Sequence, residues 1–339
     1  MVIKRDSSID IAKGLCIILV VMGHILQYNT ILGMNQPIFN FIYSFHMPVF
    51  MLLAGCVAAF QRDKVTCSNF GYFMKKKIEQ LVVPFIFWGV LVYPFINDHY
   101  YIAETFNLLS SLLKNPSLGP WFLLNLFCIH SLFLCVCLIS NKLKCSNKLI
   151  GEFISMGSLL IACYVIIKIT KMDVGEYVYN YFTPQYILFF FIGYFINAFY
   201  GSFWYNRHIF TIAIFVFSIF VPYYVFGKTS FIMKFPISFS ASFIILTFSN
   251  MLCRCNLNFK SIKTLFVFLG QNSLIIYLVH YLFVKGSVYN LTTNGISNFL
   301  LFFMIMILAV FISLLCICTA KIIQPSKLFS KLMFGKTSI

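Results

Sequence analysis

The chain has 339 residues, of which 60% are hydrophobic and only 10% are charged. A soluble protein of this length could not bury so much apolar surface, so the composition excludes a soluble globular protein and indicates an integral membrane protein with many spans. The formal net charge is +16, but the basic residues lie mainly between apolar runs without the aromatic–basic pattern of a nucleic-acid module, so we attribute them to membrane topology and expect no nucleic-acid partner.

The apolar sequence falls into ten segments, each near the length of about twenty residues that a helix needs to cross a bilayer. Backbone groups in lipid must be hydrogen-bonded internally, and the repeated alternation of a barrel is missing, so the segments are predicted to be helices. The sixth is short, the ninth is partly polar, and the eighth is interrupted by Pro236 and several serines. The predicted limits are 10–28, 38–60, 80–97, 121–139, 149–167, 184–200, 208–226, 232–250, 265–284 and 297–320.

The distribution of basic residues sets the predicted orientation. With the N-terminus in the cytoplasm, the tails and loops predicted to lie inside carry about three times as many Lys and Arg as those outside. Asp10 interrupts the start of the first apolar run, and no small-x-small cleavage site follows the end of that run at His24. We therefore expect an uncleaved span and not a signal peptide. The predicted fold class is therefore all-α: a polytopic membrane protein of about ten transmembrane helices with both termini cytoplasmic, forming a single integral-membrane domain over residues 1–339.

The 12 cysteines predict neither a disulfide framework nor a metal site. Most lie inside apolar runs, where a thiol packs as a small hydrophobic group. Cys253 and Cys255 form a C-x-C motif without the second pair that a zinc site of this kind needs.

The first span carries ionisable residues on one face. In IDIAKGLCIILVVMGH, residues 9–24, Asp10, Lys13 and His24 fall on one helical stripe. Lys13 and His24 are eleven residues apart, so they project within roughly 20° of each other and lie about 16 Å apart along the axis. Lys13 would lie at cytoplasmic headgroup depth, where it could simply snorkel to lipid phosphates. His24 would lie in the outer part of the span, where imidazole is costly, so a functional role is favoured over core packing.

A second histidine lies in the outer half of the second span. His46 precedes a Met-Pro pair in YSFHMPVFMLLAG, residues 43–55, and the proline would bend the helix. The short external loop between the first two spans predicts antiparallel packing. We therefore expect His24 and His46 to face each other.

Further polar residues occur in the fourth and ninth spans. In GPWFLLNLF, residues 119–127, Trp121 is an interfacial anchor or a site residue, and Asn125 needs a partner one turn further in. For His130 we favour core packing, whereas for His280, at the end of NSLIIYLVH, function and packing are evenly balanced. Gln271, Asn272 and Ser273 are predicted to begin the ninth span, where they could be no more than a helix cap.

These motifs, taken together, resemble those of the acyltransferase type 3 family of bacterial membrane proteins, which includes O-acetyltransferases of cell-surface glycans. Lys13 and His24 are similar to its motif of a basic residue, ten residues and a histidine; the first position is often Arg in the family, and Lys appears in many members. The remaining similar segments follow in family order and are FIYSFHMPVFMLLAG (41–55), KKKIEQLVVPFIFWG (75–89), GPWFLLNLF (119–127) and NSLIIYLVH (272–280).

The resemblance implies transfer of an acyl group, usually acetyl, from acyl-CoA to a sugar hydroxyl, with no permanently bound cofactor. For the anionic donor it implies a site made by Lys13 with Asp10 and by the basic run Lys75, Lys76 and Lys77, although that run also fits plain positive-inside topology. His24 is expected to act as the catalytic base, or alternatively to carry the acyl group. His46 is expected to be a second catalytic contact, which either orients the acceptor or shares the proton. The expected acceptor-binding residues are Trp121, Asn125 and His280.

The expected partners are the lipid bilayer, acyl-CoA and a glycan acceptor of the cell surface or an exopolysaccharide, in the bacterial inner membrane. The oligomeric state is left open, and a homo-oligomer is compatible with it. The main rival is a transporter or flippase, which would more often show broken helices in paired halves. A catalytically inactive scaffold is the third hypothesis, which the costly polar groups in lipid disfavour.

Overall fold

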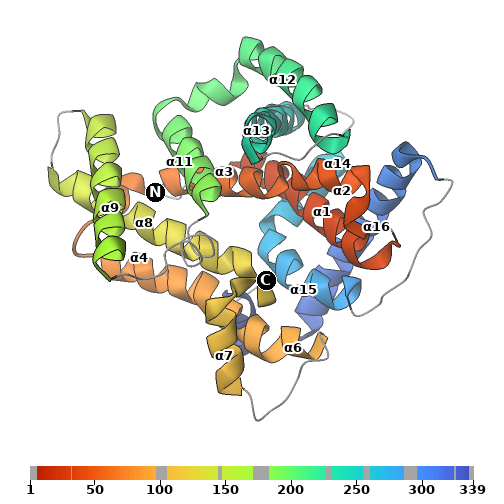
Figure 1. Ribbon diagram of the computed structural model, residues 1–339, viewed down its shortest axis with the longest axis horizontal. Coiled ribbons are helices and arrows are strands. Elements are labelled where there is room, and N and C mark those ends of the chain that lie inside the picture. Colours follow the sequence, from red (N-terminus) through yellow and green to blue (C-terminus); the bar gives the residue numbers. More distant parts are fainter. Residues whose placement is uncertain are drawn as a thin grey trace. The chain divides into compact units, whose positions relative to one another are not determined.

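We describe the fold from a computed structural model (Figure 1). It describes residues 6–31, 33–96, 105–143, 147–170, 183–226, 231–254, 260–285, 296–323 and 326–335. Every regular element formed by these residues is a helix, which confirms the all-α fold class. They group into two compact units: the first holds the described parts of Met1–Ala54 and Tyr200–Gln324, and the second those of Gly55–Phe199 and Pro325–Ser338.

Helix α1 (Ser7–Asn29) lies at the centre of the first unit. Asp6 precedes it as the N-cap residue, and its side chain accepts a hydrogen bond from the backbone N–H of Ser8 at 2.8 Å and so caps the first turn. Most of its side chains are buried, because helices pack against it along its length. The helices in contact with α1 are α2 (Pro37–Tyr43), α13 (Phe231–Arg254), α14 (Lys260–Gln271), α15 (Ser273–Val284) and α16 (Asn298–Ile323).

Two glycines allow α1 and α14 to approach closely. A Cβ atom at Gly270 would lie 1.8 Å from the backbone oxygen of Asp10, and one at Gly14 would lie 2.2 Å from that of Phe266. Small residues at such contacts are typical of helices packed inside a membrane, where van der Waals contact replaces the hydrophobic effect. Because α14 leads directly into α15, this contact also determines where α15 meets α1.

The ninth predicted span is a broken helix, in which Gln271, Asn272 and Ser273 lie where the second part, α15, begins and not at the start of the whole span. The helix already starts at Lys260, and α14 and α15 meet at Asn272 with a bend of 82°. The polar side chains supply hydrogen bonds at this break: Asn272 Nδ2 donates to the Phe268 oxygen at 2.9 Å. A break of this kind is tolerated at membrane depth only where such groups satisfy the freed backbone.

The eighth predicted span forms one continuous helix despite its proline. α13 runs through Pro236, and the hydroxyls of Ser240 and Ser242 donate to backbone oxygens of the preceding turn, as from Ser242 to Ser238 at 2.7 Å. A serine bonded in this way exposes no polar group to lipid. α12 (Arg207–Phe226) packs against α13 and corresponds to the seventh predicted span.

The second unit holds α8 (Trp121–Leu143), α9 (Lys148–Thr170), α11 (Pro184–Phe199) and α17 (Lys327–Phe334). The described part of the third predicted span, 80–96, lies in a longer run of α and π turns from Phe70 to Ile96. The last predicted residue, 97, lies outside the described residues. A buried ion pair joins Arg62 Nε to Glu152 Oε1 at 2.6 Å, and the Tyr194 hydroxyl donates to Glu152 Oε2 at 2.6 Å. Sharing both carboxylate oxygens in this way satisfies a charge that would otherwise be costly to bury.

Six described helices are long and apolar enough to cross a membrane, or seven if the bent α14–α15 pair counts as one span. Such a number of spans makes the chain a multi-pass membrane protein. The six are α1, the segment Pro37–Ala59 containing α2 and α3 (His46–Ala59), α8, α12, α13 and α16. The count of about ten spans, the cytoplasmic termini and the single domain stay predictions.

Candidate active site

His24 on α1 faces His280 and Tyr281 on α15, within the first unit. The ring centroid of His24 lies 5.1 Å from that of His280 and 5.3 Å from that of Tyr281. One turn further along α1, the Tyr28 hydroxyl lies 2.6 Å from the Tyr281 hydroxyl. These four residues form the histidine–tyrosine cluster. It brings together His24 and His280, two of the residues that the sequence predicted for the site.

A second set of contacts leads from His24 towards His46. The Nδ1 atom of His24 lies 3.2 Å from Gln27 Oε1, and the Tyr43 hydroxyl donates to the same oxygen at 3.3 Å. The Tyr43 ring packs edge-on against His46, with centroids 4.6 Å apart. His24 and His46, which the sequence predicted to face each other, are therefore connected through Gln27 and Tyr43. The sequence analysis missed both, although Gln27 lies one turn after His24 and Tyr43 one turn before His46.

These contacts favour one tautomer for each of the three histidines. A carbonyl oxygen can only accept, so the Nδ1 atom of each ring that contacts one carries the proton. The partners are Gln27 Oε1 for His24, the Ile42 oxygen for His46 at 2.8 Å and the Ile276 oxygen for His280 at 2.9 Å. Each ring therefore has an unprotonated Nε2, which is the form that accepts a proton.

Gly23 makes room for Tyr43 beside His24. A Cβ atom at position 23 would lie 2.7 Å from Cε2 of the Tyr43 ring, closer than van der Waals contact allows. The glycine therefore lets the Tyr43 ring lie against α1 and keeps its hydroxyl within reach of Gln27. This gives the glycine of the VVMGH sequence a local structural reason.

The other end of the α1 stripe holds Asp10 and Lys13. Asp10 is buried, and its Oδ2 accepts a hydrogen bond from Gln271 Nε2 at 3.4 Å. Lys13 is partly buried. Gln271 thus connects the polar stripe to the break between α14 and α15, a contact that the sequence analysis did not foresee. The pairing of Asp10 with Lys13 stays a prediction.

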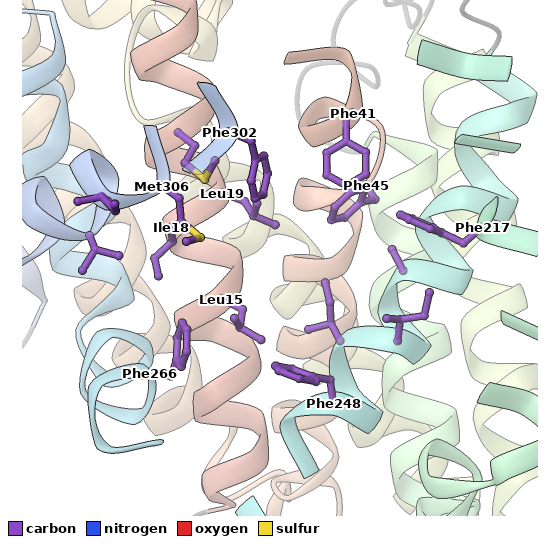
Figure 2. A pocket seen from close by; sticks show the side chains of 16 residues that line it. Leu15, Ile18, Leu19, Phe41, Phe45, Phe217, Phe248, Phe266, Phe302 and Met306 are labelled. Carbon is purple, nitrogen blue, oxygen red and sulfur yellow. The ribbon is translucent and has the colours of Figure 1, made fainter. Parts of the chain in front are cut away.

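A cavity of about 510 Å³ (Figure 2) lies on the side of α1 opposite to the stripe of Asp10, Lys13 and His24. Leu15, Ile18, Leu19 and Met22 line it, and on an α-helix these positions point away from the stripe that carries His24. Phe41 of α2, Phe45 and side chains of α12, α13, α14 and α16 complete an apolar lining. α1 therefore separates an apolar cavity from the polar residues, and the cavity does not contain the histidines.

The other predicted site residues lie in the second unit. Lys75 and Lys76 are exposed and Lys77 is partly exposed, all in the last turn of α4 (Phe70–Lys77). Glu79, just beyond this run, pairs with Lys331 at 2.8 Å, and the hydrogen bond from that ammonium lowers the pKa of the Glu79 carboxyl. The basic run is therefore an accessible cationic surface.

Trp121 and Asn125 lie one turn apart at the start of α8. The Trp121 ring stacks on Tyr186 with centroids 5.7 Å apart. Asn125 is buried and donates from Nδ2 to Thr183 Oγ1 at 3.3 Å, while its Oδ1 has no hydrogen-bond partner among the described residues. A buried amide oxygen of this kind is free to accept from a ligand. Grouping these residues with the histidines stays a prediction.

His130 has the surroundings that core packing predicts. It is buried in α8, its Nδ1 lies 3.3 Å from the Leu126 oxygen, and its ring packs edge-on against Phe190 with centroids 5.0 Å apart. Like His280, it contacts the backbone oxygen four residues earlier, but its ring packs against phenylalanines, whereas the ring of His280 packs against another histidine.

The chain belongs to the Acyltransferase domain family, whose model matches residues 6–318. Fold and family together define a multi-pass membrane protein of the acyltransferase class, which confirms the family that the motifs predicted. Membership in this family favours the enzyme over the transporter or flippase.

Among curated proteins, the chain is similar to Nodulation protein NolL of Mesorhizobium japonicum, with 36% identity over 94 residues, covering 26% of this chain and 24% of that protein. It is likewise similar to Nodulation protein NolL of Sinorhizobium fredii, with 38% identity over 93 residues, covering 26% of this chain and 25% of that protein. The match therefore spans about a quarter of the length of these relatives. No solved structure matches the chain.

Proposed function

We propose that the protein is an O-acyltransferase that moves an acyl group, chiefly acetyl, from acyl-CoA to a hydroxyl of a cell-surface or exopolysaccharide sugar. The observation that carries this proposal is His24, whose Nδ1–H is held by Gln27 Oε1 so that Nε2 is the free base. The protein would work in the bacterial inner membrane, with about ten spans and both termini in the cytoplasm. Family membership supports the reaction class.

His24 supplies the base of the proposed reaction. Its Nε2 takes the proton of the acceptor hydroxyl while the hydroxyl oxygen attacks the thioester carbonyl carbon. The C–S bond then breaks, and the departing CoA thiolate takes the proton from the imidazolium, which returns His24 to its neutral form. In the competing version Nε2 itself attacks the thioester carbonyl carbon, the C–S bond breaks and the CoA thiolate leaves. The sugar hydroxyl then attacks the acyl group on Nε2, which restores the neutral imidazole, and the hydroxyl proton goes to the thiolate.

The donor would bind at the cytoplasmic end of the stripe. CoA carries several phosphate charges, and Lys13 together with Lys75, Lys76 and Lys77 supplies cations for them. Asp10, which accepts a hydrogen bond from Gln271, would hold the Lys13 ammonium in place. The thioester would then extend along the face of α1 towards His24.

The acceptor would bind near the outer end of α1. His280, beside His24, is a binding residue in this proposal, as are Trp121 and Asn125, whose free Oδ1 suits a sugar hydroxyl. His46 takes a different role from the one expected from sequence. It packs against Tyr43, which contacts Gln27, so His46 is a positioning residue that acts on His24 through these two side chains.

The test is transfer of labelled acetyl from acetyl-CoA to glycan by the purified protein in phospholipid vesicles. We expect covalent ester on the glycan with the wild type and a loss of at least about a hundredfold with His24→Ala, because the base is removed. A His24→Ala protein with wild-type transfer would refute the role of His24. Label that crosses the vesicle membrane without forming an ester would favour the transporter.

A further inference from the structure

Two imidazoles with free acceptor nitrogens lie side by side in the histidine–tyrosine cluster. The rings of His24 and His280 have centroids 5.1 Å apart, and the Nδ1 atom of each is already bonded to a carbonyl oxygen. His280 is 1% exposed, and its Nε2 has no hydrogen-bond partner among the described residues. A buried acceptor left unpaired is costly, so this nitrogen indicates a ligand that donates to it.

The chemistry of the pair restricts that ligand. Two neighbouring lone pairs repel an anion and need hydrogen-bond donors. The Lys285 ammonium, 5.4 Å from the centre of the Tyr28 ring beside His24, disfavours a cation. A single hydroxyl has one proton and can donate to only one of the two nitrogens. Two adjacent hydroxyls on one molecule can donate to both, and a sugar presents such pairs around its ring.

We propose that His280 Nε2 accepts a hydrogen bond from the hydroxyl next to the one that is acylated, so that the acceptor is recognised as a vicinal diol. One hydroxyl of the diol donates to His24 Nε2 and is acylated, while its neighbour donates to His280 Nε2 and stays free. This inference rests on the proposed function and adds the substrate class to it. The Ile276 oxygen holds the proton of His280 on Nδ1, so the Nε2 atom of the ring is the one that accepts a hydrogen bond.

The test measures acetyl transfer by three variants in the vesicle assay. The acceptor is glycan prepared from cells that lack the protein. His280→Phe keeps a ring and removes the acceptor, whereas His280→Gln places an amide oxygen close to the position of Nε2. His130→Phe is the matched control, because His130 is also buried and makes the same contact to a backbone oxygen four residues earlier. The ester position on the product is mapped by nuclear magnetic resonance.

We expect His280→Phe to lower transfer by about ten- to a hundredfold, mainly through a higher KM for glycan at an unchanged KM for acetyl-CoA. His280→Gln should recover most of this loss, and His130→Phe should retain wild-type transfer. The ester should lie on a sugar carbon whose neighbour carries a free hydroxyl. If His280→Phe fails to fold, the inference is still tested by the transfer activity of His280→Gln and by the ester position on the product.

Three results would overturn the inference while leaving the proposed function intact. They are wild-type transfer by His280→Phe, an equal loss with His280→Gln and His280→Phe, and an ester on a carbon without a neighbouring free hydroxyl. Absence of any transfer by the wild type would instead reject the proposed function itself, so the two failures are distinguishable.

Discussion

At His24, the proposed chemistry depends on which ring nitrogen carries the proton, and Gln27 decides this. Gln27 Oε1 accepts from His24 Nδ1 and from the Tyr43 hydroxyl, so the amide is held with its oxygen towards the ring. An imidazole without this contact can adopt the other tautomer, which places the proton on Nε2 and removes the base.

Replacing Gln27 tests this dependence. We expect Gln27→Met to lower kcat by about a hundredfold, with little change in the KM for acetyl-CoA, because the acceptor for Nδ1–H is lost while the side-chain volume is kept. Gln27→Glu, which retains an acceptor oxygen, should keep substantial activity. Gln36→Met is the control: Gln36 is likewise a glutamine of the first unit, and its side chain donates to Thr30 Oγ1 at 2.9 Å, whereas the contact to His24 Nδ1 is made by Gln27. Wild-type kcat in Gln27→Met would contradict the assignment.

The sequence predicted the histidines at this scale and missed the residues that connect them. Ionisable groups in lipid are costly, which is why His24, His46 and His280 could be singled out without a structure. Gln27 and Tyr43 lie near the ends of their helices, where a polar or aromatic side chain is ordinary. Only the packing of Tyr43 against Gly23 brings its hydroxyl to Gln27, and that contact depends on side-chain directions that spacing does not give.

At the scale of elements, the close contact of α1 and α14 determines how α15 presents His280 to His24. Periodicity and hydropathy predicted that a helix covers the ninth segment. They could not predict its direction, because the 82° bend at Asn272 follows from local hydrogen bonds and from tertiary contacts of Gln271 and Gly270. The polar residues were visible in the sequence, but a cap at the start of a helix and a break within one have the same composition.

We expect Gly270→Ala to destabilise the protein by about 1–3 kcal/mol, because the added methyl group would meet the Asp10 backbone and force the two helices apart. The measurement is thermal unfolding in detergent, alongside transfer activity at a temperature where the variant is folded. Activity should fall as well, since α15 moves with α14. Gly157→Ala is the control: nothing lies within 4 Å of a Cβ atom there, so the change in stability should be small. Equal stability of the two variants would contradict the packing argument.

At the scale of the whole molecule, the proposed reaction needs a direction across the membrane. The donor belongs to the cytoplasm, so Lys13 must lie on that side and His24 further out. The orientation rests on the excess of Lys and Arg on the segments predicted to be inside, about three times the number outside. Among the residues that the structure describes, six helices, or seven with the bent pair, are long and apolar enough to span, and labelling from the two sides of the membrane tests their predicted direction.

Two exposed positions make that measurement feasible. Cys67 lies in the segment after the second predicted span, expected to be cytoplasmic, and Met34 lies between the first two spans, expected to be external. In a background without other cysteines, a membrane-impermeant maleimide should label Met34→Cys on intact cells, and Cys67 only after the membrane is permeabilised. The reverse pattern would place Lys13 on the outer side, away from cytoplasmic CoA, and would refute the proposed donor path even if His24 proved essential.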